Sequence, residues 1–295
     1  VGLLAGDASQ RRYSRVRHSD GRSAILVEYP PAIRGELVRD LEVLAWCRDR
    51  GLGVPEPLAE DRRAGRALLS DLGEGDAEAA LAAASGDARS SLADRLLQPL
   101  ETLAAIDPAD LPPWNPPLDG VRMRWEMAGF ELWFVRHLRG RCPPADLSRW
   151  LDGLAAAADA HPKRVCHRDY HVNNLLVSDT GEVGVIDIQD ILVGPDTYDV
   201  VSLTAERAAV RLLTAAERRA MLASWAEATG AAPGWRERAT TVGLQRGIKV
   251  LGTFARFTAA GRAEYGPWLA ELASALAPRL VAAGAPPAVT GLLVD

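Results

Sequence analysis

Residues 167–188 constrain the fold of this chain more than any other segment. Two short apolar runs flank the turn-forming residues 178–182, and this pattern predicts an antiparallel hairpin. Asn174 precedes the first run and Asp187 follows the second, at spacings that we take as equal from the centre of the turn. With a symmetric register the two residues are expected to face each other at the open end of the hairpin, with Cβ atoms about 5 Å apart.

Three oxygen-bearing side chains occur in order along this segment: Asp169, Asn174 and Asp187. Asp169 is expected in the loop before the first strand, where a carboxylate can accept a proton from a hydroxyl group and direct its oxygen. Mg²⁺ prefers oxygen ligands and usually takes one or two carboxylates together with substrate phosphates. Each residue alone is typical of a turn or a helix cap. The three together, in this order and spacing, predict phosphoryl transfer, in which alignment and charge neutralisation dominate.

The pattern His167-x-Asp169-x4-Asn174, with Asp187 beyond it, resembles the catalytic loop and metal-binding segment of the protein-kinase-like aminoglycoside and choline kinases. The resemblance implies that Asp169 is the catalytic aspartate, that Asn174 and Asp187 are Mg²⁺ ligands, and that ATP is the donor. It also implies a packing role for His167. The triplet at 187–189 lacks the Phe-Gly of eukaryotic protein kinases, which points away from protein substrates.

Further segments are similar to a narrower group, the anomeric kinases of N-acetylmuramate and N-acetylglucosamine in peptidoglycan recycling. This resemblance implies transfer of the γ-phosphoryl group to the anomeric hydroxyl of an N-acetylated amino sugar. It covers most of the chain in register. The segments are 5–9 with 11–13, 184–190, Gly194-Pro195 with Tyr198-Asp199, Gln245-Arg246, 249–252 and 254–256.

The expected fold is α+β and bilobal, as in protein kinases, with a small antiparallel sheet and a mainly helical second lobe. Residues 1–70 are predicted to form the nucleotide-binding lobe, 71–76 the hinge and 77–295 the helical lobe. In the first lobe, strand-like runs at 13–17 and 24–28 flank a Ser-Asp-Gly turn. Residues 37–50 have the apolar spacing of an amphipathic helix that ends at Gly51, and 67–69 form a further strand.

Composition is that of a cytoplasmic enzyme. The chain has 295 residues, a formal net charge of −5 and no basic tract, which gives nucleic acid no obvious binding surface. It has no apolar run of about twenty residues, so we expect no membrane span, and its start has no signal-peptide pattern. The three cysteines are far apart, which argues against a disulfide framework or a zinc site. No obligate protein partner is evident.

A phosphate-binding lysine is missing from the predicted nucleotide lobe. The chain has two lysines, Lys163 and Lys249, and strand 24–28 has none. Arg11 and Arg12 are the candidates to replace it, because arginine is always charged and can grip phosphate with two donors. The alternative is that both arginines are solvated surface residues.

The remaining nucleotide contacts are predicted by position. Ser9 and nearby backbone amides are expected to support the phosphates. Ala24 and Leu26 are expected to cover the adenine ring, and backbone groups near Asp71 and Leu72 to bond its edge. GTP is not excluded as the donor.

The acceptor site is predicted on a helical segment at 122–139. Glu126 is expected on the face shared with Phe130 and Trp133, where a carboxylate among aromatic rings must be paired or functional. A carboxylate can accept sugar hydroxyls while aromatic faces cover the sugar ring. For Trp133 and Phe134 we favour the alternative, an aromatic core stripe.

Three residues near the catalytic segment are further candidates for acceptor binding. His171 flanks Asp169, and Gln189 and Asp190 directly follow Asp187. For Asp190 the alternative is a turn cap.

Two other functions stay open at this point: a kinase for an antibiotic or for choline, and a non-catalytic protein with a kinase fold. A kinase for a polycationic antibiotic is expected to have a dense acidic pocket, and a choline kinase an aromatic cage. A non-catalytic protein with this fold is expected to have lost Asp169 or Asp187.

Overall fold

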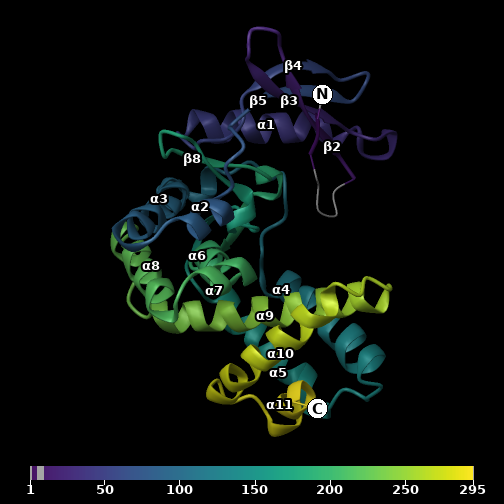
Figure 1. Ribbon diagram of the computed structural model, residues 1–295. Coiled ribbons are helices and arrows are strands. Elements are labelled where there is room, and N and C mark those ends of the chain that lie inside the picture. Colours follow the sequence, from purple (N-terminus) through teal and green to yellow (C-terminus); the bar gives the residue numbers. More distant parts are fainter. Residues whose placement is uncertain (1, 5–9, 295) are drawn as a thin grey trace. The chain divides into compact units, whose positions relative to one another are not determined.

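The computed structural model describes residues 2–4 and 10–294, and the chain divides into two compact units. The first unit contains Val1–Asn115, Val165–Leu192 and Leu203–Ala231, and the second contains Pro116–Arg164, Val193–Ser202 and Ala232–Asp295. Each unit is therefore assembled from segments that are far apart in the sequence (Figure 1).

An antiparallel sheet with strand order β1-β2-β3-β5-β4 lies in the first unit (Figure 1). The predicted hairpin is confirmed, because β2 and β3 pair with Tyr13 opposite Val27 and Val16 opposite Ala24. Gly21, with φ +90°, occupies the turn, where a residue without Cβ is favoured. The strands are β1 (Gly2–Leu3), β2 (Arg12–Arg17), β3 (Ser23–Glu28), β4 (Pro57–Asp61) and β5 (Arg66–Ser70).

Helix α1 (Glu36–Asp49) confirms the predicted amphipathic helix and packs on this sheet. Leu37, with Leu41 and Leu44 beside it, contacts a core that contains Val27 and Ala67. Burying these apolar side chains stabilises the pair of elements through removal of apolar surface from water. The helix ends before Gly51, whose φ of +82° favours glycine.

The rest of the first unit is mainly helical and holds a two-stranded hairpin of β7 and β8. Helix α8 begins with a capping box in which Thr214 and Glu217 bond each other's backbone N–H groups. Three short elements, β6, β9 and α6, cross from one unit to the other along the chain. The ranges are α2 (Ala77–Ala83), α3 (Gly86–Ala104), β6 (Lys163–Cys166), β7 (Leu175–Val177), β8 (Val183–Val185), β9 (Leu192–Pro195), α6 (Tyr198–Ala205), α7 (Arg207–Leu212) and α8 (Ala215–Ala228).

The second unit is built from helices. The predicted helical segment at 122–139 is helical, but α4 continues from Phe130 to Leu138 as a π-helix. Phe130 and Phe134 are buried and stacked with ring centroids 5.3 Å apart, which supports the core alternative for Phe134. No helix in the described part of the chain is both long and apolar enough to cross a lipid bilayer. The helices are α4 (Gly120–Gly129), α5 (Ala145–Asp159), α9 (Trp235–Ala259), α10 (Tyr265–Ala282) and α11 (Pro287–Val294).

Gly252 lets two helical segments of the second unit approach closely. A Cβ atom on Gly252 of α9 would lie 2.5 Å from the Phe130 nitrogen and 2.6 Å from the Gly129 carbonyl carbon. Both of these are backbone atoms, so they cannot turn aside as a flexible side chain could. Glycine is therefore required where α9 crosses the junction between α4 and the π-helix.

Candidate active site

The hairpin of β7 and β8 differs from the predicted register by one residue. Leu175 pairs with Val185, and the Ile186 N–H donates to the Asn174 carbonyl at 3.0 Å, so Ile186 lies opposite Asn174. The expectation that Asp187 lies opposite Asn174 is wrong. The turn is closed by a bond from Ser178 N–H to the Glu182 carbonyl, which centres the register on Thr180 and leaves Asp187 one residue further out.

Asp187 is positioned by the turn that follows β8. Its φ of +63° places it in the left-handed region, which ends the strand, and its side chain is exposed. The buried Gln189 amide donates to Asp187 Oδ1 at 2.8 Å. Asn115 holds the same turn by donating to the carbonyls of Gln189 and Ile191, each at 2.9 Å. Sequence reasoning missed Asn115, whose only signal was a lone amide in a proline-rich loop.

Asp169 and Asn174 are joined by a direct bond. The Asn174 Nδ2 donates to the Asp169 carbonyl at 2.9 Å, which orients the amide. Because the amide nitrogen makes this bond, the amide oxygen is the atom that can accept a hydrogen bond or bind a cation. Asp169 and Asn174 are both partly buried, as a shared reaction site requires.

His167 connects this loop to the end of β8. Its ring is buried, with Nε2 2.9 Å from the Ile186 carbonyl and Nδ1 3.3 Å from the Asp169 nitrogen. The Ile186 carbonyl can only accept, so Nε2 carries the proton and Nδ1 accepts from the Asp169 N–H. One neutral histidine thereby links the backbone of Asp169 to the residue before Asp187.

Backbone strain is concentrated beside these residues. Arg168, with φ +81°, and Asp187 are the two non-glycine residues with positive φ among those the structure describes. Such conformations are costly and persist where surrounding contacts hold them, typically at functional sites. Here Tyr170 supplies one such contact, because its buried hydroxyl donates to the Leu96 carbonyl of α3 at 2.8 Å.

The three acceptor candidates next to the catalytic segment lie in the same compact unit as Asp169. His171 Nε2 is 3.4 Å from the Asn174 amide nitrogen. Asp190 forms an ion pair with Arg168 at 3.6 Å and ends the turn, so its interactions also fit the alternative of a structural residue. Gln189 acts on Asp187, as described above.

The central strand β3 presents Ala24 and Leu26 on one face and Ile25 and Val27 on the other. Val27 is on the face that packs against α1, so Ala24 and Leu26 share the opposite face. Both are partly buried. This placement is compatible with the predicted cover over an adenine ring. Ser9 lies outside the described residues.

Asp71, at the predicted hinge, is tied to β2 by Arg15. The Arg15 Nε and Nη2 atoms donate to the two carboxylate oxygens at 2.6 and 3.0 Å, and the Gly73 N–H adds a third bond at 3.0 Å. Burial by itself would raise the pKa of Asp71, but the hydrogen bonds from Arg15, Ser23 and Gly73 lower it below its ordinary value. Leu72 packs on Gly184 of β8, where a Cβ would lie 2.8 Å from Leu72 Cδ1.

The two candidate phosphate arginines differ in environment. Arg11 has a side chain only 14% exposed, and its Nη1 donates to Asp40 of α1 at 3.1 Å. Arg12 is exposed at the start of β2. Sequence reasoning missed Asp40. Its signal was a carboxylate three residues after Leu37 on the apolar face of a helix, where an unpaired charge is unfavourable.

Glu126 belongs to the second unit and is 9% exposed. The Gln245 amide donates to its Oε2 at 3.3 Å, and Lys249 Nζ lies 3.6 Å from its Oε1 and 3.5 Å from the Tyr198 hydroxyl. The buried carboxylate is thus paired with a cation, as burial of charge requires. Trp125, beside it in sequence, is 74% exposed.

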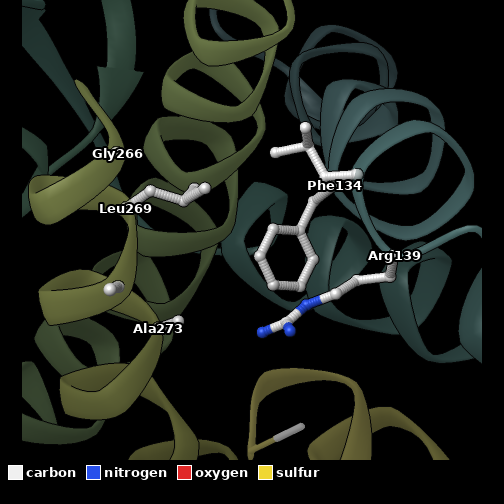
Figure 2. Close-up of a pocket in the computed structure, with 7 residues that line it drawn as sticks. Phe134, Arg139, Gly266, Leu269 and Ala273 are labelled. Atoms are coloured by element: carbon white, nitrogen blue, oxygen red, sulfur yellow. The ribbon is translucent and has the colours of Figure 1, made fainter. Parts of the chain in front are cut away.

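An apolar cavity of about 210 Å³ lies in the second unit and holds none of the candidate catalytic residues. Figure 2 shows Phe134 and Arg139 facing Gly266, Leu269 and Ala273 of α10 across it. The Arg139 guanidinium lies over the Phe134 ring at 5.0 Å, a cation–π contact. The candidate chemistry is in the other unit.

The oxygen donors present fit magnesium. Among the described residues no group of three or more His, Cys, Asp or Glu side chains could by itself hold a metal ion. Magnesium does not need such a cage, because it keeps waters and binds through one or two carboxylates plus phosphates. The Asp187 carboxylate and the Asn174 amide oxygen would hold it in that way.

Comparison with known proteins decides the family. The sequence profile described as "Phosphotransferase enzyme family" matches residues 1–240. The chain belongs to this family. The match contains the segment with Asp169, Asn174 and Asp187, and this phosphotransferase is therefore an enzyme whose family chemistry agrees with the function that those residues predict.

Curated relatives that match most of this phosphotransferase share a name. A protein of Pseudomonas aeruginosa called N-acetylmuramate/N-acetylglucosamine kinase is 34% identical over 264 residues, 85% of this chain and 75% of that protein. A protein of Neisseria meningitidis with the same name is 31% identical and covers 90% of this chain and 81% of its own length.

Solved structures similar to this phosphotransferase confirm the expected α+β, protein-kinase-like fold. The aminoglycoside-3'-phosphotransferase of type VIII has a TM-score of 0.59 at 18% identity, covering 84% of this chain and 94% of its own. Choline kinase LicA of Streptococcus pneumoniae has a TM-score of 0.60 at 14% identity, covering 94% and 95%.

Proposed function

We propose that this phosphotransferase transfers the γ-phosphoryl group of ATP to the anomeric hydroxyl of an N-acetylated amino sugar, N-acetylglucosamine or N-acetylmuramate. The observation that carries the proposal is the bonding of Asp169 to Asn174 and, through His167, to Ile186, the residue directly before Asp187. The sugar is supported by the shared name of relatives that match most of the chain. A cytoplasmic location, which suits an enzyme that uses ATP, is part of the same proposal.

In the proposed reaction the anomeric oxygen attacks the γ-phosphorus and its proton passes to the Asp169 carboxylate. The new bond joins the sugar oxygen to phosphorus, the bond from phosphorus to the bridging oxygen breaks, and ADP leaves. Because the transition state is loose, the main task of Asp169 is to aim the hydroxyl. Asn174 and Asp187 would hold Mg²⁺, which would supply charge neutralisation for the phosphates. The bond from Gln189 keeps Asp187 oriented for this.

The nucleotide is proposed to bind against residues of the sheet. Ala24 and Leu26 would cover the adenine from the face of β3 opposite α1, and backbone groups near Asp71 and Leu72 would bond its edge. Arg11 is the stronger candidate for the phosphates because it is held in place, whereas Arg12 is exposed. The lobe boundaries at 1–70, 71–76 and 77–295 remain part of this proposal.

Acceptor binding is proposed for His171 and Asp190 in the first unit, with Gln189 acting mainly through Asp187. Glu126 in the second unit is proposed separately as an acceptor-binding residue. Glu126, already paired with Lys249, would accept a sugar hydroxyl while its charge stays compensated. The charge of Glu126 is compensated by Lys249, whereas a polycationic antibiotic favours several uncompensated carboxylates. The observation therefore favours a sugar over an aminoglycoside.

The test is a kinase assay with Mg²⁺ and ATP across N-acetylglucosamine, N-acetylmuramate, an aminoglycoside and choline. We expect acceptor-dependent ADP release with the two sugars, and phosphorus NMR of the product to show a phosphate coupled to the anomeric proton. Asp169→Asn should lower kcat by about a hundredfold to ten-thousandfold. Asp179→Asn, at an exposed aspartate of the same hairpin, is the matched control and should retain activity. Transfer to the aminoglycoside or choline alone, or full activity of Asp169→Asn, overturns the proposal.

A further inference from the structure

A buried carboxylate on α1, Asp40, has no role in the chemistry described so far. It is 4% exposed, and its two oxygens are engaged from different sides. Oδ2 accepts from Arg11 at 3.1 Å and from the Tyr29 hydroxyl at 2.9 Å, whereas Oδ1 accepts from Arg39 at 2.9 and 3.1 Å. A buried charge needs such partners, but two arginines and a tyrosine exceed what is needed to neutralise one carboxylate.

Arg11 is the partner whose position is unusual. It stands just before β2, at the end of the segment predicted to cover the nucleotide phosphates, yet it is largely buried. Its guanidinium lies 5.7 Å from the centre of the Tyr29 ring. Burial by itself would lower the pKa of Arg11, but Tyr13, Asp40, Tyr29 and Asp187 together raise it above its ordinary value.

The packing of α1 relates Asp40 to the catalytic hairpin. Helix α1 packs against the turn Ile188–Asp190, which directly follows Asp187. Just beyond α1, the Gly53 carbonyl accepts a bond from the Val185 N–H of β8 at 2.7 Å. Helix α1 and the residues just beyond it are thus fastened to the catalytic hairpin and its turn, and Asp40 is carried on this helix. A side chain held by Asp40 is held relative to Asp187.

Charge then determines what Arg11 does. Without Asp40, the Arg11 guanidinium would be mobile and would pair with other carboxylates within its reach. Asp40 provides a fixed carboxylate that holds the guanidinium in one position. A fixed guanidinium presents charge and donors to phosphate at a smaller loss of side-chain entropy than a mobile one.

We propose that Asp40 is a positioning residue for nucleotide binding, which holds Arg11 where its guanidinium meets the α- and β-phosphates of ATP. The inference rests on the proposed function for the identity of the nucleotide. In this proposal Asp40 and Arg11 together provide the phosphate contact, because strand β3 has no lysine that could provide it.

The test compares Arg11→Ala, Asp40→Asn, the double variant and Arg39→Ala. Arg39 bonds the same carboxylate from the other side, so it is the matched control. We expect Arg11→Ala and Asp40→Asn each to raise the KM for ATP and the Kd for MgADP about tenfold or more, the loss of a hydrogen bond to a charged group. The KM for the sugar should change little, and the double variant should resemble Arg11→Ala. Arg39→Ala should keep nucleotide affinity.

Binding of MgADP separates the possible failures. If no amino sugar is phosphorylated, the proposed function fails, but MgADP affinities of the same four variants still test Asp40. If the wild type is active and Asp40→Asn binds MgADP normally, or the two losses add fully in the double variant, the inference fails. Where Asp40→Asn does not fold, Arg11→Lys replaces it: retained charge without the held geometry should still weaken MgADP binding, and unchanged affinity overturns the proposal.

Discussion

A single buried histidine, His167, connects the backbone of the candidate base to the residue that precedes the candidate metal ligand Asp187. It bonds the Asp169 N–H with one ring nitrogen and the Ile186 carbonyl with the other. The resemblance of the sequence to known kinases implied packing for His167, which its burial agrees with. The two bonds add a positioning role that spacing cannot show, since it depends on a contact between segments nineteen residues apart.

Asp71 provides a pH-dependent prediction for one residue. Its pKa is lowered in the folded protein, so its contribution to stability is present above the ordinary carboxyl range and is lost as the pH falls through the folded pKa. Arg15→Ala removes the main hydrogen-bond donor to Asp71. The free energy of unfolding should therefore fall less on acidification in this variant than in the wild type. Urea unfolding between neutral pH and about pH 3, near the ordinary aspartate pKa, measures this.

Arg17→Ala is the control for that experiment. Arg17 is two residues further along β2 and pairs with the exposed Glu74, so it removes a surface ion pair without touching Asp71. Surface ion pairs contribute little to stability. The free energy of unfolding of Arg17→Ala should therefore depend on pH as that of the wild type does. Equal curves for Arg15→Ala and the wild type contradict the prediction.

At the scale of elements, periodicity predicted the elements with strong local signals. The β2–β3 hairpin, α1 and β5 appear where the sequence places them. Strand β4 was missed, because Pro57–Asp61 is mostly exposed and has no alternating pattern. The change to a π-helix at Phe130 was also missed. It coincides with the close crossing at Gly252, a contact with a helix more than a hundred residues away.

That crossing predicts a large effect for a small substitution. Gly252→Ala would place a methyl group 2.5 Å from a backbone nitrogen, so α9 must move away from the π-helix. We expect the free energy of unfolding to fall by about 1–3 kcal/mol, as in other overpacked sites. Thermal or urea unfolding measures the change.

Gly153→Ala is its matched control. Gly153 lies inside α5, and a Cβ there meets nothing within 4 Å. The same change should therefore stabilise the protein by about 0.5–1 kcal/mol through helix propensity. If both variants shift stability in the same direction, the close crossing is not what makes Gly252 special.

At the scale of the whole molecule, ligand binding should report on the metal site without any turnover. A ligand that binds only the folded state stabilises it, by about 2.7 kcal/mol at a hundred times its Kd. MgATP should raise the Tm of the wild type, and EDTA should remove the magnesium-dependent part. Asp187→Asn should lack the magnesium-dependent increase in Tm, while Asp179→Asn should keep it. A magnesium increment retained in Asp187→Asn removes Asp187 from the site.

The sequence by itself determined the chemistry and the family. Asp169, Asn174 and Asp187 lie close together along the chain, so their spacing alone carries the signal that the family match then supported. Only the tertiary structure decided that Ile186 rather than Asp187 faces Asn174, and that Asp40 holds Arg11 rather than Arg12. A register depends on how a turn closes, and a buried ion pair depends on which distant segments pack together. Neither can be predicted from the spacing of residues along the chain.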